Sequence, residues 1–331
     1  MRLSPILILA SLAAAQAPRI GIIDFYGLRK VSENRVRRVL GVSEGDPLPP
    51  SKGDVETRLD GLGGVVEAQL EAVCCENGKM ILYVGIEERG TPHFERRESP
   101  EGDVKLSADV LDLYRQFLQA LEVAARKGDT ADDVTRGHSL LANPEARAIQ
   151  QQFIPIAKDH LEELRKVLRS AGDEEHRAAA AFIIGYAPRK SEVVGDLQFA
   201  LRDPSSAVRN NAVRALGAFA VLAKLDPQSG VRVSPTWFIE MLNSVDWTDR
   251  NKAVWVLQTL TDNRDASVLE QLRERAMPSL VEMARWKALS HALPAYMLVG
   301  RIAGIPDEEL EERWSKGERE AVIAQALKKK K

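Results

Sequence analysis

The first part of the chain alternates between short apolar runs and polar stretches that end in glycine. Residues 19–25 hold three isoleucines and a phenylalanine before Gly27, which predicts a first strand. Two short helices are expected next, because Ser32 and Ser51 stand where helix caps are favoured and apolar residues follow at helical spacing. Glycines close both helical segments, as is common at helix ends.

The pattern then changes to a period of two, which is typical of a half-buried strand. Apolar residues occupy alternate positions, namely Val66, Ala68, Leu70, Ala72 and Cys74. Asn77-Gly78 is the preferred pair for a tight hairpin turn, and alternation resumes at Met80. Residues 18–88 are therefore predicted to fold in the order β-α-α-β-β, with the last two strands forming a hairpin.

This order resembles that of the POTRA domains of outer-membrane and secretion machinery. The resemblance rests on the strand G-V-V-E-A-Q-L (64–70), the Asn-Gly turn and a last strand that closes on I-E-E (86–88). It implies a periplasmic domain that binds other polypeptides, often by adding a strand to an exposed sheet edge. The alternative is a small α/β domain that only docks the following helices.

Residues 89–105 are rich in charge, proline and glycine, and they predict a linker. Beyond them, apolar residues recur at helical spacing. Residues 106–168 are predicted to form a helical cap region, in which Pro155 should kink or divide a helix.

The rest of the chain contains an internal repeat. Three segments align: L-R-S-A-G-D-E-E-H-R-A-A-A-A-F-I-I-G (168–185), L-R-D-P-S-S-A-V-R-N-N-A-V-R-A-L-G (201–217) and L-N-S-V-D-W-T-D-R-N-K-A-V-W-V-L-Q-T-L (242–260). Each copy has a leucine that ends one helix, an aspartate in the turn, and an arginine near the start of the next helix. Their spacing is typical of paired-helix repeats that must stack to bury an apolar face.

The second segment resembles a HEAT repeat, in the form also seen in the phycobilin-lyase-like group. The resemblance implies that the turn aspartate and the helix-starting arginine hold neighbouring repeats together, as Asp203 with Arg209 and, more loosely, Asp173 with Arg177. Residues 169–327 are thus predicted to form an all-α solenoid. The fold class is α+β and multidomain, with a POTRA-like domain followed by HEAT-like repeats.

Composition is that of an ordinary folded protein, with 44% hydrophobic and 28% charged residues in 331. The net charge of -2 predicts no nucleic-acid partner, because such proteins usually concentrate basic residues on one face. The lysine run 328–331 is interpreted as a solubilising basic tail.

Residues 1–17 combine one arginine, an apolar stretch and an A-x-A pattern, which predicts a cleavable secretory signal peptide. Cleavage is expected after Ala15, and an uncleaved anchor is the alternative. No later apolar stretch is long enough to span a bilayer. A periplasmic or secreted location without an integral membrane segment is therefore expected.

Cys74 and Cys75 are the two cysteines of the chain. Neighbours on a strand point to opposite faces, so one buried and one exposed thiol are expected, without a disulfide between them. A redox or intermolecular role is the alternative.

Motifs of catalysis or metal binding are not recognisable, and no cofactor is expected. The predicted function is an interaction scaffold of the cell envelope that binds other proteins or peptides through the sheet edge, the concave solenoid surface, or both. A phycobilin-lyase-like enzyme or small-molecule-binding protein is the alternative, and a structural role is a further one.

The five tryptophans lie in the last third of the chain, and exposed tryptophans often mark interfaces. Trp255 and Trp286 have apolar neighbours and are assigned to the core. Trp247 falls in the expected turn S-V-D-W-T-D-R, where burial is not required. The predicted partner-binding residues are Trp247, Arg250, Arg209 and Asn210.

Overall fold

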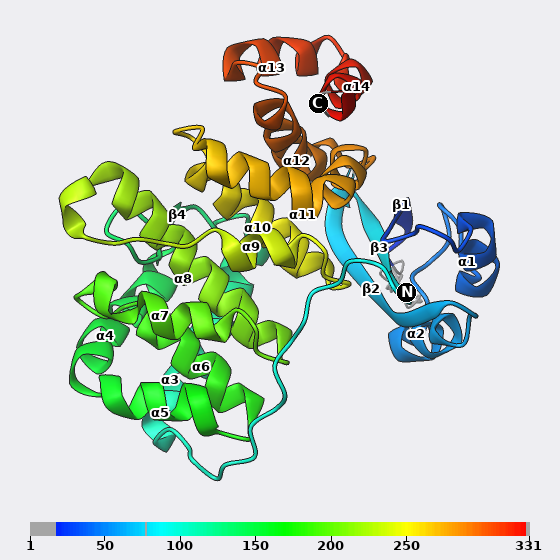
Figure 1. Ribbon diagram of the computed structural model, residues 1–331. Coiled ribbons are helices and arrows are strands. Elements are labelled where there is room, and N and C mark those ends of the chain that lie inside the picture. Colours follow the sequence, from blue (N-terminus) through cyan, green and yellow to red (C-terminus); the bar gives the residue numbers. More distant parts are fainter. Residues whose placement is uncertain (1–17, 77, 329–331) are drawn as a thin grey trace, which may run out of the picture.

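The computed structural model describes residues 18–76 and 78–328, and it shows a small sheet domain beside a long array of helices (Figure 1). The predicted signal peptide, 1–17, and the last three lysines, 329–331, lie outside the described residues. Among the helices that the structure describes, none is long and apolar enough to cross a membrane.

The small domain has its elements in the predicted order. They are β1 (Ile20–Tyr26), α1 (Glu33–Leu40), α2 (Lys52–Asp60), β2 (Val65–Glu76) and β3 (Lys79–Glu88). The strand order is β1-β3-β2, with β1 parallel and β2 antiparallel to β3. One face of the sheet packs against α1 and α2, whereas the other packs against the solenoid (Figure 1).

The central strand β3 is buried on both faces because its side chains alternate between two cores. Leu82, Val84 and Ile86 belong to the core under α1 and α2. Ile81 and Tyr83 belong to the core of the helical array. The small domain and the solenoid are therefore not independent bodies joined by a tether; they share buried apolar surface.

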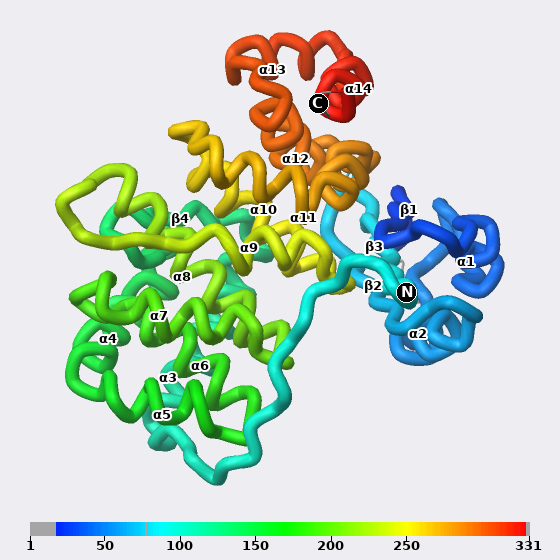
Figure 2. Tube along the Cα trace, viewed as in Figure 1, coloured from blue at the N-terminus to red at the C-terminus, as the bar shows by residue number. Residues whose placement is uncertain are grey.

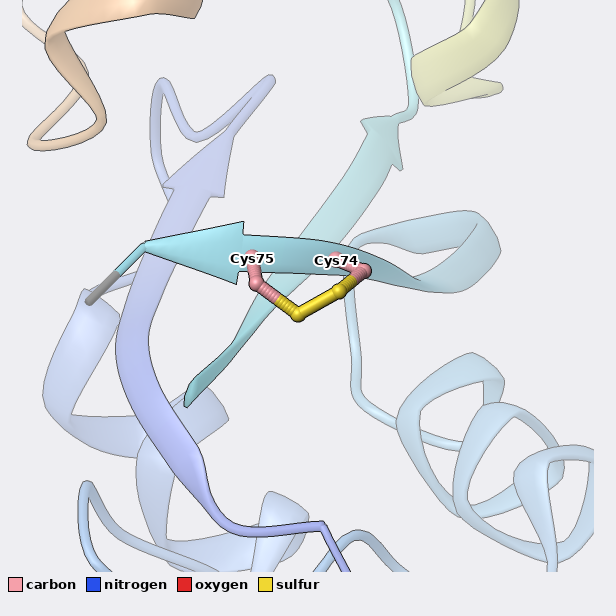
Figure 3. The surroundings of a disulfide bond; sticks show 2 residues. All are labelled: Cys74 and Cys75. Carbon is pink, nitrogen blue, oxygen red and sulfur yellow. A yellow bond between two sulfur atoms is a disulfide. The ribbon is translucent and has the colours of Figure 1, made fainter. Parts of the chain in front are cut away.

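The cysteine prediction is wrong. Cys74 and Cys75 are both exposed, and they are joined by a disulfide (Figure 3). The strict alternation assumed from the sequence ends at a bulge. Val73 pairs with Ile81 and Glu76 pairs with Lys79, so both cysteines lie between paired positions of the ladder.

The cap region consists of α3 (Ala108–Arg126), the two-residue strands β4 (Asp132–Asp133) and β5 (Leu140–Leu141), and α4 (Pro144–Asp159). The small hairpin was not predicted. Pro155 lies within α4, and the helical region divides at His160 instead, where α4 ends and α5 begins.

The remaining helices form the predicted solenoid. They are α5 (Leu161–Ser170), α6 (Glu174–Ile184), α7 (Lys190–Ala200), α8 (Ser206–Leu225), α9 (Thr236–Met241), α10 (Trp247–Leu260), α11 (Ala266–Ala284), α12 (Leu289–Ile302), α13 (Asp307–Ser315) and α14 (Arg319–Lys328). The second helices of the pairs, α6, α8, α10, α12 and α14, contact one another in sequence and form one layer. The first helices pack against them as a second layer.

Buried arginines join neighbouring repeats. Arg177 Nη2 donates to Asp203 Oδ1 of the next repeat at 3.0 Å, and Arg209 Nε lies 3.0 Å from both carboxylate oxygens of Asp249. Each guanidinium also donates to backbone carbonyls of the turn before its own helix. The implied pairing of Asp203 with Arg209 is thus shifted by one repeat, because the Asp203 carboxylate binds Arg177.

The third arginine of the series reaches the sheet domain. Arg250 donates to the Ser244 carbonyl, and its guanidinium lies 4.6 Å from the ring centroid of Tyr26 in β1. The Tyr26 hydroxyl donates to the Val245 carbonyl at 2.6 Å. Gly85 permits this approach, since an added Cβ would lie 2.4 Å from the same carbonyl. The sheet domain therefore docks against the turn between α9 and α10.

The predicted linker is a docked strap, defined here as residues 89–107. It runs without helix or strand along the solenoid, past the turns of three successive repeats (Figure 2). Arg96 lies 3.8 Å from Asp246, and Arg97 donates to Asp203 at 3.1 Å. Gly102 exchanges backbone hydrogen bonds with Ser170 and Gly172. Its polar sequence thus serves to bind the turns.

Candidate functional site

The structure places three of the four predicted partner-binding residues inside the molecule. Trp247 is only 8% exposed, Arg209 is fully buried and Arg250 is 3% exposed. Trp247 begins α10 and its ring packs on the sheet, so the expectation that it faces a partner from a turn is wrong. Arg209 joins two repeats, and Arg250 contacts both Tyr26 of β1 and Glu282 of α11. Of the four residues, only Asn210, half-buried on α8, reaches the surface.

Trp255 and Trp286 are both predicted to be core residues, and the structure confirms only one of them. Trp286 is buried as expected, whereas Trp255 is 51% exposed, although it was assigned to the core. Its apolar neighbours Val254 and Val256 point inward. Helical spacing alone predicts the exposure of Trp255, because this residue follows Asn251 by one turn and therefore lies on the polar stripe of α10.

The candidate site is the α8–α10 face, defined by Asn210 and Arg214 of α8 and by Asn251, Lys252 and Trp255 of α10. These residues lie on the outer stripes of two adjacent second helices, where Trp255 is exposed and the other four are half-buried. Helical spacing of four residues separates Asn210 from Arg214 and Asn251 from Trp255. The face is thus a mixed polar and apolar surface with one large aromatic ring.

The face is cationic at its centre. Arg214 Nη2 donates to Asp132 of the β4–β5 hairpin at 2.7 Å, and to Ser139 Oγ at 3.0 Å. Burial, and then the positive charge of Arg214, lower the pKa of Lys252 below its usual value; Asp132 opposes this in part. One carboxylate therefore faces two cationic side chains.

Two polar atoms of this face have no hydrogen-bond partner within the described chain. They are Asn251 Oδ1 and Arg214 Nε, and both are shielded by neighbouring atoms. Unpaired buried polar atoms carry a free-energy cost, which a ligand with the complementary donor or acceptor would remove. Asn251 offers an acceptor and Arg214 a donor.

The edges of the sheet, which were the other predicted binding surface, are largely occupied. On β2, the backbone amides of Ala68 and Leu70 donate to Asp60 and Glu56 of α2, each at 2.7 Å. Occupied edge amides cannot pair with an added strand.

The β1 edge is occupied by other segments. The Ile20 amide donates to the Asp46 carbonyl at 2.9 Å, and Lys287 Nζ donates to the Ile23 carbonyl at 2.9 Å. Strand addition to β1 would therefore have to displace both the loop before α2 and a side chain of the solenoid.

A cavity lies where the sheet meets the solenoid, between Gly27, Ile86, Asn243 and Ser279. Its volume of about 50 Å³ is far below that of ordinary small-molecule sites. Within residues 18–76 and 78–328, no cluster of three or more histidine, cysteine, aspartate or glutamate side chains could hold a metal ion.

Lys190 is a buried cation near the cap. It is 6% exposed, donates from Nζ to the Gly185 carbonyl at 2.9 Å, and lies 5.6 Å from the Phe219 ring centroid. Burial lowers the pKa of Lys190 from 10.5 to about 7. Nearby, burial and the charge of Lys190 lower the pKa of His138 to about 4.

Comparison with known proteins supports the repeat architecture. Residues 161–229, which span α5 to α8, match the family model for HEAT repeats. The C-terminal region is therefore a helical repeat solenoid. No curated protein matches the chain.

The solved structures that match the chain include designed armadillo repeat proteins. One, described as computationally designed for modular peptide recognition, is 18% identical and covers 64% of this chain and 98% of its own, with a TM-score of 0.35. A second, in complex with the peptide (KR)4, is 18% identical and covers 67% and 99%, with a TM-score of 0.36.

Proposed function

We propose that the protein is a non-enzymatic interaction scaffold that binds an extended polypeptide segment on the α8–α10 face. The observation that carries this is the exposed ring of Trp255 one helical turn from Asn251, whose side-chain oxygen lacks a donor. Apolar side chains of a bound peptide can pack on the indole ring, and its backbone can supply the missing donor once the Asn251 side chain turns outward. Large aromatic residues dominate the binding energy at many protein interfaces.

Charge indicates which segment fits. Lys252 and Arg214 share one carboxylate, that of Asp132, so the centre of the face favours a further negative charge. We infer that the bound segment carries an aspartate or glutamate opposite Lys252, beside an apolar residue that packs on Trp255.

The α8–α10 face is favoured over the sheet edges because the edge amides of β2 and backbone groups of β1 are already bonded. Strand addition would first require these bonds to break. On the solenoid face the Trp255 ring is already exposed, so a partner can pack on it without breaking a backbone hydrogen bond.

The cellular setting is part of the proposal. The β-α-α-β-β order supports a POTRA-like identity for the small domain, and the pattern of residues 1–17 supports export to the periplasm or beyond. We infer an envelope protein in which the sheet domain is held on the solenoid and the α8–α10 face is left free for a partner.

The test is selection of short linear peptides from a displayed library against the purified full chain. Selected peptides should share an acidic residue near an apolar one. Trp255→Ala should weaken their binding by roughly 2 kcal/mol, or about thirtyfold in Kd. Lys252→Glu should abolish preference for the acidic residue.

Leu225→Ala is the matched control, because Leu225 is 60% exposed on α8 but lies outside the α8–α10 face. It should leave Kd unchanged. Peptides that bind equally well to all three variants would place the binding surface elsewhere and contradict the proposal.

A further inference from the structure

The disulfide of β2 lies outside both hydrophobic cores and is not part of the α8–α10 face. Cys74 and Cys75 are exposed near the end of the strand, just before the hairpin turn (Figure 3). Neither cysteine is among the buried apolar residues of the two cores. Both sulfur atoms therefore belong to residues that solvent can reach.

The backbone at this point is not part of the ladder. The paired positions on either side are Val73 with Ile81 and Glu76 with Lys79, and the cysteines form the bulge between them. The sheet is anchored farther along β2 by Ala68 and Leu70, which are buried in the core under α1 and α2. Opening the disulfide consequently requires no loss of paired strand or of buried apolar surface.

The edge of β2 is also open here. The amides of Ala68 and Leu70 are covered by side chains of α2, whereas Ala72, Cys74 and Cys75 are all exposed. By the two-residue alternation of a strand, Ala72 is the next residue to direct its backbone groups outward. A reacting partner can therefore approach the disulfide from the edge.

We propose that Cys74 and Cys75 form a reversible redox site that exchanges electrons with a dithiol, such as a dithiol–disulfide oxidoreductase. Exposed disulfides flanked by open backbone are accessible to thiolate attack, whereas buried structural disulfides are not. The proposal does not depend on peptide binding by the solenoid.

The exchange has two steps. A thiolate of the reductant attacks Sγ of one cysteine, a bond forms between the two sulfurs, the Cys74–Cys75 bond breaks, and the displaced thiolate takes up a proton. The second thiol of the reductant then attacks the reductant's own sulfur in this mixed disulfide. The bond to the protein breaks, and the other cysteine is released as a thiol. Two electrons and two protons pass to the protein, and the reductant ends as a disulfide.

The first experiment measures access to the site in the folded full chain. The air-oxidised protein should gain no adduct from N-ethylmaleimide. After treatment with dithiothreitol it should gain two, with its circular dichroism and melting transition unchanged. Adducts on the oxidised protein, or reduction that succeeds only in urea, would overturn the proposal.

The second experiment tests closure between the neighbouring sulfurs. Reduced protein is treated with the aromatic disulfide dithiobis(nitrobenzoate). The wild type should release two thionitrobenzoate ions and retain no adduct, because the second cysteine displaces the first adduct. Cys74→Ser and Cys75→Ser should each release one and keep one. Retained adducts on the wild type, or disulfide-linked dimers, would contradict an intramolecular redox site.

Discussion

The ring of Tyr83 in β3 stacks on the ring of Trp247 in α10, with centroids 5.0 Å apart and planes inclined by 23°. Trp286 lies against the same tyrosine at 4.9 Å. The Tyr83 hydroxyl also forms a hydrogen bond of 2.7 Å with His291 Nδ1. These contacts join the sheet to two successive repeats, so the two parts should unfold as one unit.

Trp247→Ala should lower the free energy of unfolding by roughly 3 to 5 kcal/mol, because it opens a cavity between the sheet and the solenoid. Chemical denaturation followed by circular dichroism measures the change. Trp255→Ala is the matched control and should stay within about 0.5 kcal/mol of wild type, since its ring is exposed. Similar losses for both variants would show that the stacked contact is not a main support of the junction.

Arg209→Ala should destabilise the protein by roughly 3 to 5 kcal/mol, because it leaves the Asp249 carboxylate buried without its guanidinium. Arg126→Ala removes an ion pair with Glu122 in which both side chains are exposed, and should cost at most about 1 kcal/mol. Melting temperatures of the two variants at equal protein concentration give the comparison. If Arg209→Ala behaved like Arg126→Ala, the buried arginines would not be what holds neighbouring repeats together.

The buried Lys190 should make stability depend on pH between about 7 and its ordinary pKa of 10.5. In this window the unfolded chain keeps the proton that the folded chain has lost, so the free energy of unfolding should rise with pH. The slope for one proton is at most about 1.4 kcal/mol per pH unit. Below about pH 7 Lys190 is charged in both the folded and the unfolded chain, so the free-energy cost of burying its charge no longer varies with pH.

Lys190→Met isolates this contribution. The stability of the wild type relative to the variant should increase from pH 7 to pH 9 and stay level from pH 5 to 6, as measured by urea denaturation. A difference that does not vary with pH over the upper range would mean that Lys190 keeps its ordinary pKa.

Protease should cut the strap slowly in the wild type, because its backbone is bonded to two turns of the solenoid and Arg96 forms an ion pair with a third. Arg97→Ala removes the bond to Asp203 and the contact with the Phe199 ring, whose centroid lies 3.7 Å from the guanidinium. Cleavage within 89–107 should then become several times faster. Arg232→Ala, at an exposed position, should not change the rate. Rapid cleavage of the wild type in this segment would show that the strap is free after all.

Sequence alone determined the local elements. The order of strands and helices in the small domain, the pairing of β2 with β3 and the repeat of paired helices all follow from the spacing of apolar residues and from cap and turn residues, which act within a few positions of one another. The aligned arginines were recognisable for the same reason. Even the exposure of Trp255 was present in the pattern, since helical spacing puts it on a polar stripe.

Only the tertiary structure decided what covers each surface. Trp247 looks exposed when its own turn is considered, but β3, distant in the chain, lies over it. Arg250 stands where a repeat arginine is expected and pairs with Glu282 of α11, yet its guanidinium also lies over a tyrosine of β1. The charged strap resembles a free linker until the turns that it binds are in place. Burial depends on contacts between residues far apart in the chain, and a periodic pattern records only which side of its own element a residue faces.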